Sequence, residues 1–203
     1  MNSEEQKRFL AMALRRTAPG SGSQLDEVRD RGVHYTGQPD LGPLADVRHV
    51  VVGGLAVALY MPPRNTLDVD VLIARDDLAY AEERLAESGW RYLGPLSVGG
   101  SSWSLPNGIP LDLLALERTW IREALDQPVR DAGPAATPFI ALPYLVIMKL
   151  ESGRLQDLAD ISRMLGYAGV GQIDEVRAAV RQHRPQDVED LESMLQLGKM
   201  EHQ

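Results

Sequence analysis

Short apolar runs separated by turn residues, followed by longer runs of helical periodicity, set the pattern of this chain. Apolar runs of strand length at residues 50–52, 67–73 and 109–114 predict buried strands. Residues 77–89 have an acidic start, an apolar side and a terminal glycine, which predict a helix packed on the sheet. From residue 119 onward the pattern is helical, with a break at residues 134–138 and a last helix starting at Pro185. We therefore expect an α+β fold, a mixed sheet with flanking helices and a C-terminal helical region.

Proline and glycine divide this pattern into three parts. A capping-box spacing starts a first helix at Ser3, and the Pro-Gly-Ser-Gly-Ser run at residues 19–23 ends it as a linker. We expect an N-terminal helix and linker over residues 1–43, a core over residues 44–137 and a helical region over residues 138–203.

A hairpin is the clearest local prediction. Asn107-Gly108 stands between apolar segments, so residues 101–105 should pair with residues 109–114. This pairing places Asp112, the only charge in its run, on a strand. The preceding stretch, residues 94–102, is predicted to be a glycine-rich loop without a phosphate-binding spacing.

Two carboxylates interrupt the second apolar run. Asp68 and Asp70 stand two apart, and side chains at i and i+2 of a strand point to the same face. A divalent ion such as Mg²⁺ would relieve their repulsion, because Mg²⁺ is usually held by one or two carboxylates with water and substrate phosphates. The alternative is a strand end whose two aspartates face water.

A diglycine bend precedes this pair. Gly53 and Gly54 follow the strand at residues 50–52 and open an apolar helix at residues 55–60. Glycines at such a bend let a phosphate approach the backbone, where the N–H groups of the helix start favour an anion. Ordinary turn chemistry would also explain a diglycine alone.

Together, Gly53-Gly54, Arg64, Thr66, Asp68 and Asp70 resemble the signature of the DNA polymerase β-like nucleotidyltransferase superfamily, nearest to AbiEii-type toxins and allied small nucleotidyltransferases. The resemblance implies a nucleotidyltransferase-fold core. In it the glycines cradle a triphosphate, Arg64 and Thr66 belong to the nucleotide site, and the two aspartates bind Mg²⁺ or Mn²⁺. Many members have Gly-Ser at the bend, whereas this chain has Gly-Gly followed by Leu55. The phosphate contact of a serine hydroxyl is therefore missing, and backbone N–H groups would take its place.

The resemblance also extends to three residues downstream. Asp112 corresponds to a third carboxylate that holds the metal and acts as, or orients, the general base; a buried aspartate bonded to backbone is the alternative. Lys149 corresponds to a triphosphate contact, although a lysine near a helix C-terminus is favourable without a ligand. Asp157 corresponds to a nucleotide-site residue, and with Arg154 and Asp160 it could equally form an ordinary ion-paired surface.

Composition narrows these expectations. The net charge of −8 argues against a broad electrostatic grip on nucleic acid, and the absence of cysteine excludes disulfides and zinc-thiolate sites. The four histidines show no metal-ligand spacing. No segment approaches the roughly 18 apolar residues of a membrane span, and no signal-peptide pattern is visible, so we expect a cytoplasmic protein without membrane partners.

The implied activity is transfer of an NMP from an NTP to a hydroxyl acceptor with release of pyrophosphate. The acceptor would be RNA, protein or a small molecule, and a toxin role would add a cognate antitoxin as partner. A non-catalytic nucleotide-binding or toxin–antitoxin partner protein with the same fold is the alternative. A glycosyltransferase or a haloacid dehalogenase-like phosphatase also uses Asp-x-Asp, but the surrounding residues disfavour both.

Overall fold

The computed structural model describes residues 40–63, 66, 68–130 and 137–201. They divide between Ala141 and Leu142 into two compact units, a sheet unit over residues 40–141 and a helical unit over residues 142–201. The expected α/β class with a mixed sheet and several helices is confirmed. The predicted first helix and Arg64 lie outside the described residues, and the boundaries proposed at residues 43 and 137 stay predictions.

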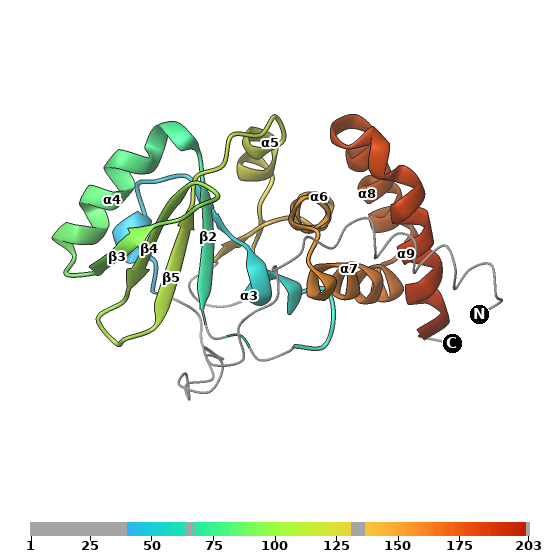
Figure 1. Cartoon of the computed structure of the whole chain (residues 1–203), viewed down its shortest axis with the longest axis horizontal. Helices are drawn as coiled ribbons and strands as arrows, with labels where there is room; N and C mark the ends of the chain where they lie inside the picture. Colours follow the sequence, from blue (N-terminus) through green and yellow to red (C-terminus); the bar gives the residue numbers. More distant parts are fainter. Residues whose placement is uncertain (1–39, 64–65, 67, 131–136, 202–203) are drawn as a thin grey trace. The chain divides into compact units, whose positions relative to one another are not determined.

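The described part of the sheet unit contains a seven-stranded sheet in the order β3-β4-β5-β2-β1-β7-β6 (Figure 1). Neighbouring strands pair antiparallel except for β2 with β5 and β1 with β7, which are parallel. The strands are β1 His49–Val51, β2 Val69–Ile73, β3 Arg91–Pro95, β4 Gly100–Ser104, β5 Pro110–Leu114, β6 Val129–Arg130 and β7 Pro138–Phe139.

The centre of this sheet is its most apolar part. Val50, Val71 and Leu113 are fully buried on β1, β2 and β5. Strands covered on both faces carry such continuous apolar runs, which is why an aspartate on either β2 or β5 stands out. The predicted hairpin is confirmed, since β4 pairs antiparallel with β5 and the Leu105 amide donates to the Ile109 carbonyl at 2.9 Å.

Short helices connect the strands. They are α3 Gly53–Val57, α4 Leu78–Glu87 and α5 Ile121–Asp126, with 3₁₀ turns at Gly42–Leu44 and Arg75–Asp77. α4 contacts β3 and buries Ala81 and Leu85, as its apolar side predicts. Asp77 occupies the N-cap position as expected, but it makes no side-chain capping bond, and a 3₁₀ turn leads into the helix.

The helical unit consists, over its described residues, of α6 Leu142–Ser152, α7 Leu155–Tyr167, α8 Val170–His183 and α9 Val188–Glu201, with a 3₁₀ turn at Pro185–Asp187 before α9. α7 packs against α9, and α6 packs against α7 and α8. Arg177 of α8 forms a two-pronged ion pair with Glu192 of α9, with N···O distances of 2.6 and 2.7 Å. These hydrogen bonds raise the pKa of Arg177 and lower the pKa of Glu192, so the pair is charged at neutral pH.

Two sequence expectations were wrong. Residues 94–102, predicted as a loop, contribute to β3 and β4, which pair with a register shift between Tyr92 and Gly94. The stretch after residue 119 was expected to be helical, yet β6 and β7 lie within it. Among the helices of the described residues, none has the length and apolar content that a membrane span requires.

Candidate functional site

The sheet brings two of the predicted carboxylates together. Asp70 of β2 and Asp112 of β5 are direct register partners on neighbouring parallel strands. Partners in register point to the same face of a sheet, with Cβ atoms roughly 5 Å apart. Ser102 of β4 is in turn the partner of Asp112. Asp70, Asp112 and Ser102 therefore form one row across three strands, which we call the acidic row, and each is partly exposed.

Gly53 lies directly against this row. Its φ of +62° is in the left-handed region, and a Cβ built on it would be 1.7 Å from Asp70 Oδ2. The neighbouring Val52 amide donates to the Asp70 carbonyl at 2.9 Å, which fixes the bend beside the end of β2. Glycine is therefore required here for two reasons, backbone conformation and close approach of a carboxylate.

Gly54 and Thr66 make a second close contact beside the first. A Cβ on Gly54 would be 2.6 Å from Thr66 Oγ1, and Thr66 is only 7% exposed. The Thr66 hydroxyl donates to Asp68 Oδ1 at 3.1 Å. This bond holds the Asp68 carboxylate just ahead of β2, so the residues of the predicted glycine bend and Asp-x-Asp motif are structurally connected.

The carboxylates have the chemistry that a hard divalent cation requires, but they do not form a complete protein cage. Within the residues that the structure describes, no three His, Cys, Asp or Glu side chains are grouped to hold a metal ion. The register pair Asp70 and Asp112 instead supplies two oxygen donors side by side. That number suits Mg²⁺, which keeps waters and takes further oxygens from substrate phosphates. The metal roles of Asp68, Asp70 and Asp112 stay predictions.

Lys149 and Asp157 lie in the helical unit and contact each other there. Lys149 Nζ is 2.6 Å from Asp157 Oδ1 and 2.8 Å from Asp160 Oδ2. The side chains of Lys149 and Asp160 are 6% and 0% exposed, so the group is largely removed from water. Gln156 Nε2 donates to Asp160 Oδ1 at 3.0 Å, and the Ser152 hydroxyl donates to Asp157.

This buried ion cluster gives Lys149 a partner set that the sequence pattern did not suggest. Two carboxylates around one ammonium make its contact with a phosphate dependent on breaking or sharing those bonds. The predicted phosphate role of Lys149 and site role of Asp157 remain predictions. Ser102 had no predicted role, and Asp160 was named only with Arg154 and Asp157 in the alternative of an ion-paired surface. Ser102 becomes visible only through strand register, and Asp160 only through its burial.

Comparison with solved structures gives several overlaps, of which two are described here. No protein-family model and no curated protein matches this chain. A crystal structure of ANT(2'')-Ia in complex with adenylyl-2''-tobramycin overlaps with 77% of this chain and 92% of its own, at 17% identity and a TM-score of 0.39. A solution structure of the antibiotic-resistance factor ANT(2'')-Ia overlaps with 99% of this chain and 97% of its own, at 15% identity and a TM-score of 0.40. TM-scores below 0.5 do not establish a shared family, so a proposal about function depends on the residues of this chain.

Proposed function

We propose that this protein is a nucleotidyltransferase that moves an NMP from an NTP to a hydroxyl acceptor and releases pyrophosphate. The observation that carries the proposal is the Asp70–Asp112 register pair with the left-handed Gly53 pressed against Asp70. A glycine bend for phosphates beside two in-register carboxylates is what a triphosphate-metal site needs. The motif resemblance of residues 53–70 supports the same assignment.

Each residue has a defined task in this proposal. The backbone of Gly53 and Gly54 receives the triphosphate, because a glycine bend at a helix start lets a phosphate approach the N–H groups closely. Arg64 and Thr66 belong to the nucleotide site, Thr66 by fixing the Asp68 carboxylate. In the helical unit, Lys149 is proposed to contact the triphosphate, and Asp157 is proposed to belong to the nucleotide site.

In the transfer step, Asp112 accepts the proton of the acceptor hydroxyl. The oxygen forms a bond to the α-phosphorus, the bond from that phosphorus to its β-bridging oxygen breaks, and pyrophosphate leaves with the electron pair. Asp68, Asp70 and Asp112 are the residues that would hold Mg²⁺ or Mn²⁺, which neutralises phosphate charge when bound. The protein's share of catalysis is then positioning and charge placement.

The net charge of the protein is the property that narrows the choice of acceptor. A chain with a net charge of −8 gains little from a broad contact with a phosphate backbone. We therefore favour a hydroxyl of a protein or a small molecule over RNA. A toxin role, with a cognate antitoxin as partner, is one biological setting of this activity, and arrest of growth on expression that depends on Asp70 would support it.

A non-catalytic nucleotide-binding protein is the second candidate. It is favoured by the ion pairs of Lys149, because the predicted phosphate contact is already held by Asp157 and Asp160. Such a protein would bind NTP with Mg²⁺ but would release no pyrophosphate.

Labelled nucleotides separate the two candidates. Purified protein is incubated with each α-labelled NTP, Mg²⁺ and cell extract, beside the Asp68→Ala/Asp70→Ala double variant. Label on a protein, an RNA or a small molecule in the wild-type reaction alone supports the transferase and identifies the acceptor class. Absence of both label and pyrophosphate with all four nucleotides contradicts it.

A further inference from the structure

Ser102 is the member of the acidic row that has no role in the transfer step proposed above. It lies in the middle of β4, between β5 and the edge strand β3 (Figure 1), and its register partners there are Asp112 and Gly94. Burial alternates along β4, with Ser101 and Trp103 buried and Ser102 partly exposed. Because side chains alternate between the faces of a strand, Ser102 shares the partly exposed face with Asp112.

The other two serines of β4 have different surroundings. On the buried face, Ser101 Oγ accepts a hydrogen bond from the Trp103 indole at 2.9 Å. Ser104 is on the same face as Ser102, but its register partner is Pro110. Ser102 is therefore the serine of this strand that has a carboxylate directly beside it.

The order of the strands decides what Ser102 can reach. Neighbouring strands are about 4.8 Å apart, so Ser102 is one spacing from Asp112 and two spacings, roughly 10 Å, from Asp70. β1, which leads into Gly53, is on the opposite side of β2 from β5. Ser102 and the glycine bend proposed for the triphosphate are thus on opposite sides of Asp112.

One oxygen atom fits between the side chains of Ser102 and Asp112. Register partners have Cβ atoms about 4.5–5.5 Å apart, and O–H···O hydrogen bonds are about 2.5–3.0 Å long. An ionised carboxylate only accepts hydrogen bonds, whereas a serine hydroxyl can donate one. An alcohol oxygen at this place can donate its proton to Asp112 and accept the proton of Ser102, and one of its lone pairs remains for a bond to phosphorus.

The space on the β3 side of Ser102 is open. Gly94 is the neighbour of Ser102 in that direction, and a Cβ built on it meets no atom of the described residues within 4 Å. β3 is also the edge strand of the sheet over the described residues. A molecule that binds over Gly94 can therefore reach Ser102 and Asp112 from the edge of the sheet.

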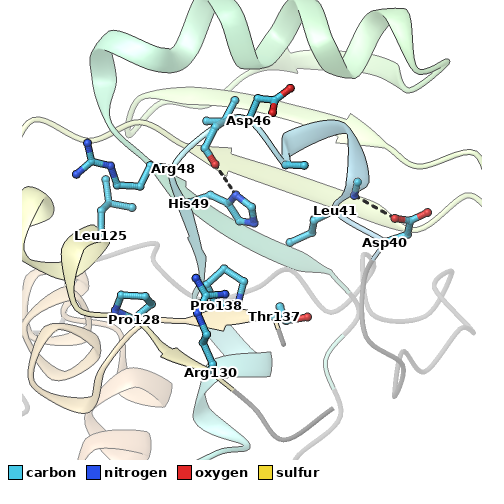
Figure 2. Close-up of a pocket in the computed structure, with 13 residues that line it drawn as sticks. Asp40, Leu41, Asp46, Arg48, His49, Leu125, Pro128, Arg130, Thr137 and Pro138 are labelled. Atoms are coloured by element: carbon cyan, nitrogen blue, oxygen red, sulfur yellow. Dashed lines mark hydrogen bonds between the residues drawn. The ribbon is translucent and has the colours of Figure 1, made fainter. Parts of the chain in front are cut away.

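A cavity in the sheet unit lies apart from the acidic row. It has a volume of about 740 Å³ and is enclosed by the turn before β1, the start of β1, the segment after α5, and β6 with β7. Figure 2 shows His49, Arg130 and Pro138 in its wall. Its lining contains neither Ser102 nor Asp112. Because a general base must be within hydrogen-bond reach of the hydroxyl that it deprotonates, a hydroxyl activated by Asp112 lies outside this cavity.

We propose that Ser102 positions the acceptor in the transfer step. Its hydroxyl donates a hydrogen bond to the acceptor hydroxyl, whose proton passes to the Asp112 carboxylate. The acceptor oxygen bonds to the α-phosphorus, and pyrophosphate leaves with the electron pair of the broken bond. The body of the acceptor lies over Gly94 on the β3 side, and the triphosphate lies on the β1 side. This inference rests on the proposed function and adds the side from which the acceptor binds.

The test uses a pair of variants that differ only in the hydroxyl group. Ser102→Thr keeps it, and Ser102→Val replaces it with a methyl group in a side chain of the same shape. Ser102→Ala repeats the removal without added bulk, and Ser104→Val is the matched control on the same face of β4. Pyrophosphate release is measured with Mg²⁺, each NTP and a fixed amount of cell extract as the source of acceptor. Calorimetry measures binding of the NTP analogue in which a methylene group joins the α- and β-phosphorus atoms.

We expect the maximal rate of release to fall about tenfold in Ser102→Val and Ser102→Ala, the effect of losing one hydrogen bond. Ser102→Thr and Ser104→Val should stay close to the wild type. The KM for NTP and the affinity for the analogue should be unchanged in all four variants, because Ser102 contacts the acceptor and not the nucleotide. Equal rates in Ser102→Thr and Ser102→Val, or a wild-type rate in Ser102→Ala, would overturn the proposal. A loss of analogue affinity in Ser102→Val as large as its loss of rate would also overturn it.

Asp112→Asn, measured beside these variants, separates this inference from the proposed function. Release that depends on Asp112 but not on Ser102 leaves the nucleotidyltransferase in place and removes only the role of Ser102. A wild-type protein that releases no pyrophosphate with any NTP contradicts the nucleotidyltransferase and the role of Ser102 together.

Discussion

Gly53 is the position at which adding one methyl group would have the largest local effect, because a Cβ there would be 1.7 Å from Asp70 Oδ2. An alanine there must keep the left-handed conformation, at a cost of about 1–2 kcal/mol, and must also place its Cβ against the Asp70 carboxylate. The second effect is overpacking, which typically costs about 1–3 kcal/mol. We therefore expect Gly53→Ala to lower the free energy of unfolding by the sum of both and to abolish nucleotide transfer.

Gly89 provides the matched control for this prediction. It also has a positive φ, +80°, but a Cβ built on it meets nothing within 4 Å. Gly89→Ala should therefore show only the conformational cost in urea unfolding and retain activity. Equal destabilisation by the two substitutions, or full activity of Gly53→Ala, would show that the close approach to Asp70 has no functional meaning.

His49 makes stability depend on pH in a defined direction. Its pKa is lower in the folded protein than the ordinary value of 6.5, mainly because of burial. The unfolded chain thus binds a proton more readily, so the free energy of unfolding is highest above pH 6.5 and falls as the pH drops below it, until the folded pKa is passed. Urea unfolding between pH 5 and 8 should show this slope.

Substitution separates His49 from the other titrating groups. His49→Gln should reduce the slope near pH 6, whereas His183→Gln should leave the contribution of His49 in place. An unchanged slope in the His49 variant would mean that the surroundings of this half-buried ring do not lower its pKa.

The ion cluster between α6 and α7 is an effect at the scale of elements. Lys149→Met leaves Asp160, which is fully buried, and Asp157 without their cation. Removal of one partner from a buried ion pair typically costs about 3–5 kcal/mol. We expect a loss of this size in the free energy of unfolding, measured with urea at pH 7.

Lys199→Met, at an exposed lysine of α9, is the control and should change stability by less than about 0.5 kcal/mol. A Lys149→Met protein that is as stable as the wild type and yet inactive would point to the nucleotide-contact role instead. Such a result would contradict a mainly structural role of the cluster.

Element prediction succeeded where the pattern was local. The hairpin could be predicted because its turn is formed by neighbouring residues: the Gly108 amide donates to the Leu105 carbonyl at 2.8 Å across Pro106 and Asn107. The register that follows places Asp112 on β5. β3 was missed, and the loop predicted over residues 94–102 overlapped the start of β4, because Gly94, Gly99 and Gly100 interrupt the alternation that identifies a strand. β6 and β7 are two residues each, too short for any periodicity, and only pairing with neighbours makes them strands.

Candidate site residues could also be predicted only where they belong to a local sequence pattern. The Gly-Gly bend and Asp-x-Asp could be identified as candidates because they are contiguous motifs, and Gly53 lies against Asp70. Their roles in a site stay predictions. Asp160 could not be recognised as a partner of Lys149, because its helical spacing from Asp157 is also typical of an exposed ion-paired face. Burial is a tertiary property, set here by the packing of α7 against α9 and α6.

At the scale of the whole molecule, the features that bear on function are the net charge and the distribution of the candidate residues over the two units. The sheet unit contains both the acidic row and the cavity, each built from its own set of residues. The helical unit contains the ion cluster of Lys149. An overall charge of −8 disfavours nonspecific retention of polyanions, so any anion that the protein binds must be held by local groups.

The most direct test of the central claim is pyrophosphate release from each NTP with Mg²⁺ and cell extract as the source of acceptor, with wild type, Asp70→Asn, Asp112→Asn and the exposed control Asp76→Asn side by side. We predict NTP-dependent release by wild type and Asp76→Asn. The Asp112→Asn rate should fall by about 10²–10⁴-fold, the usual contribution of a general base, with a loss at least as large for Asp70→Asn. Release that is equal in all four proteins would contradict the assignment of the acidic row as the catalytic site.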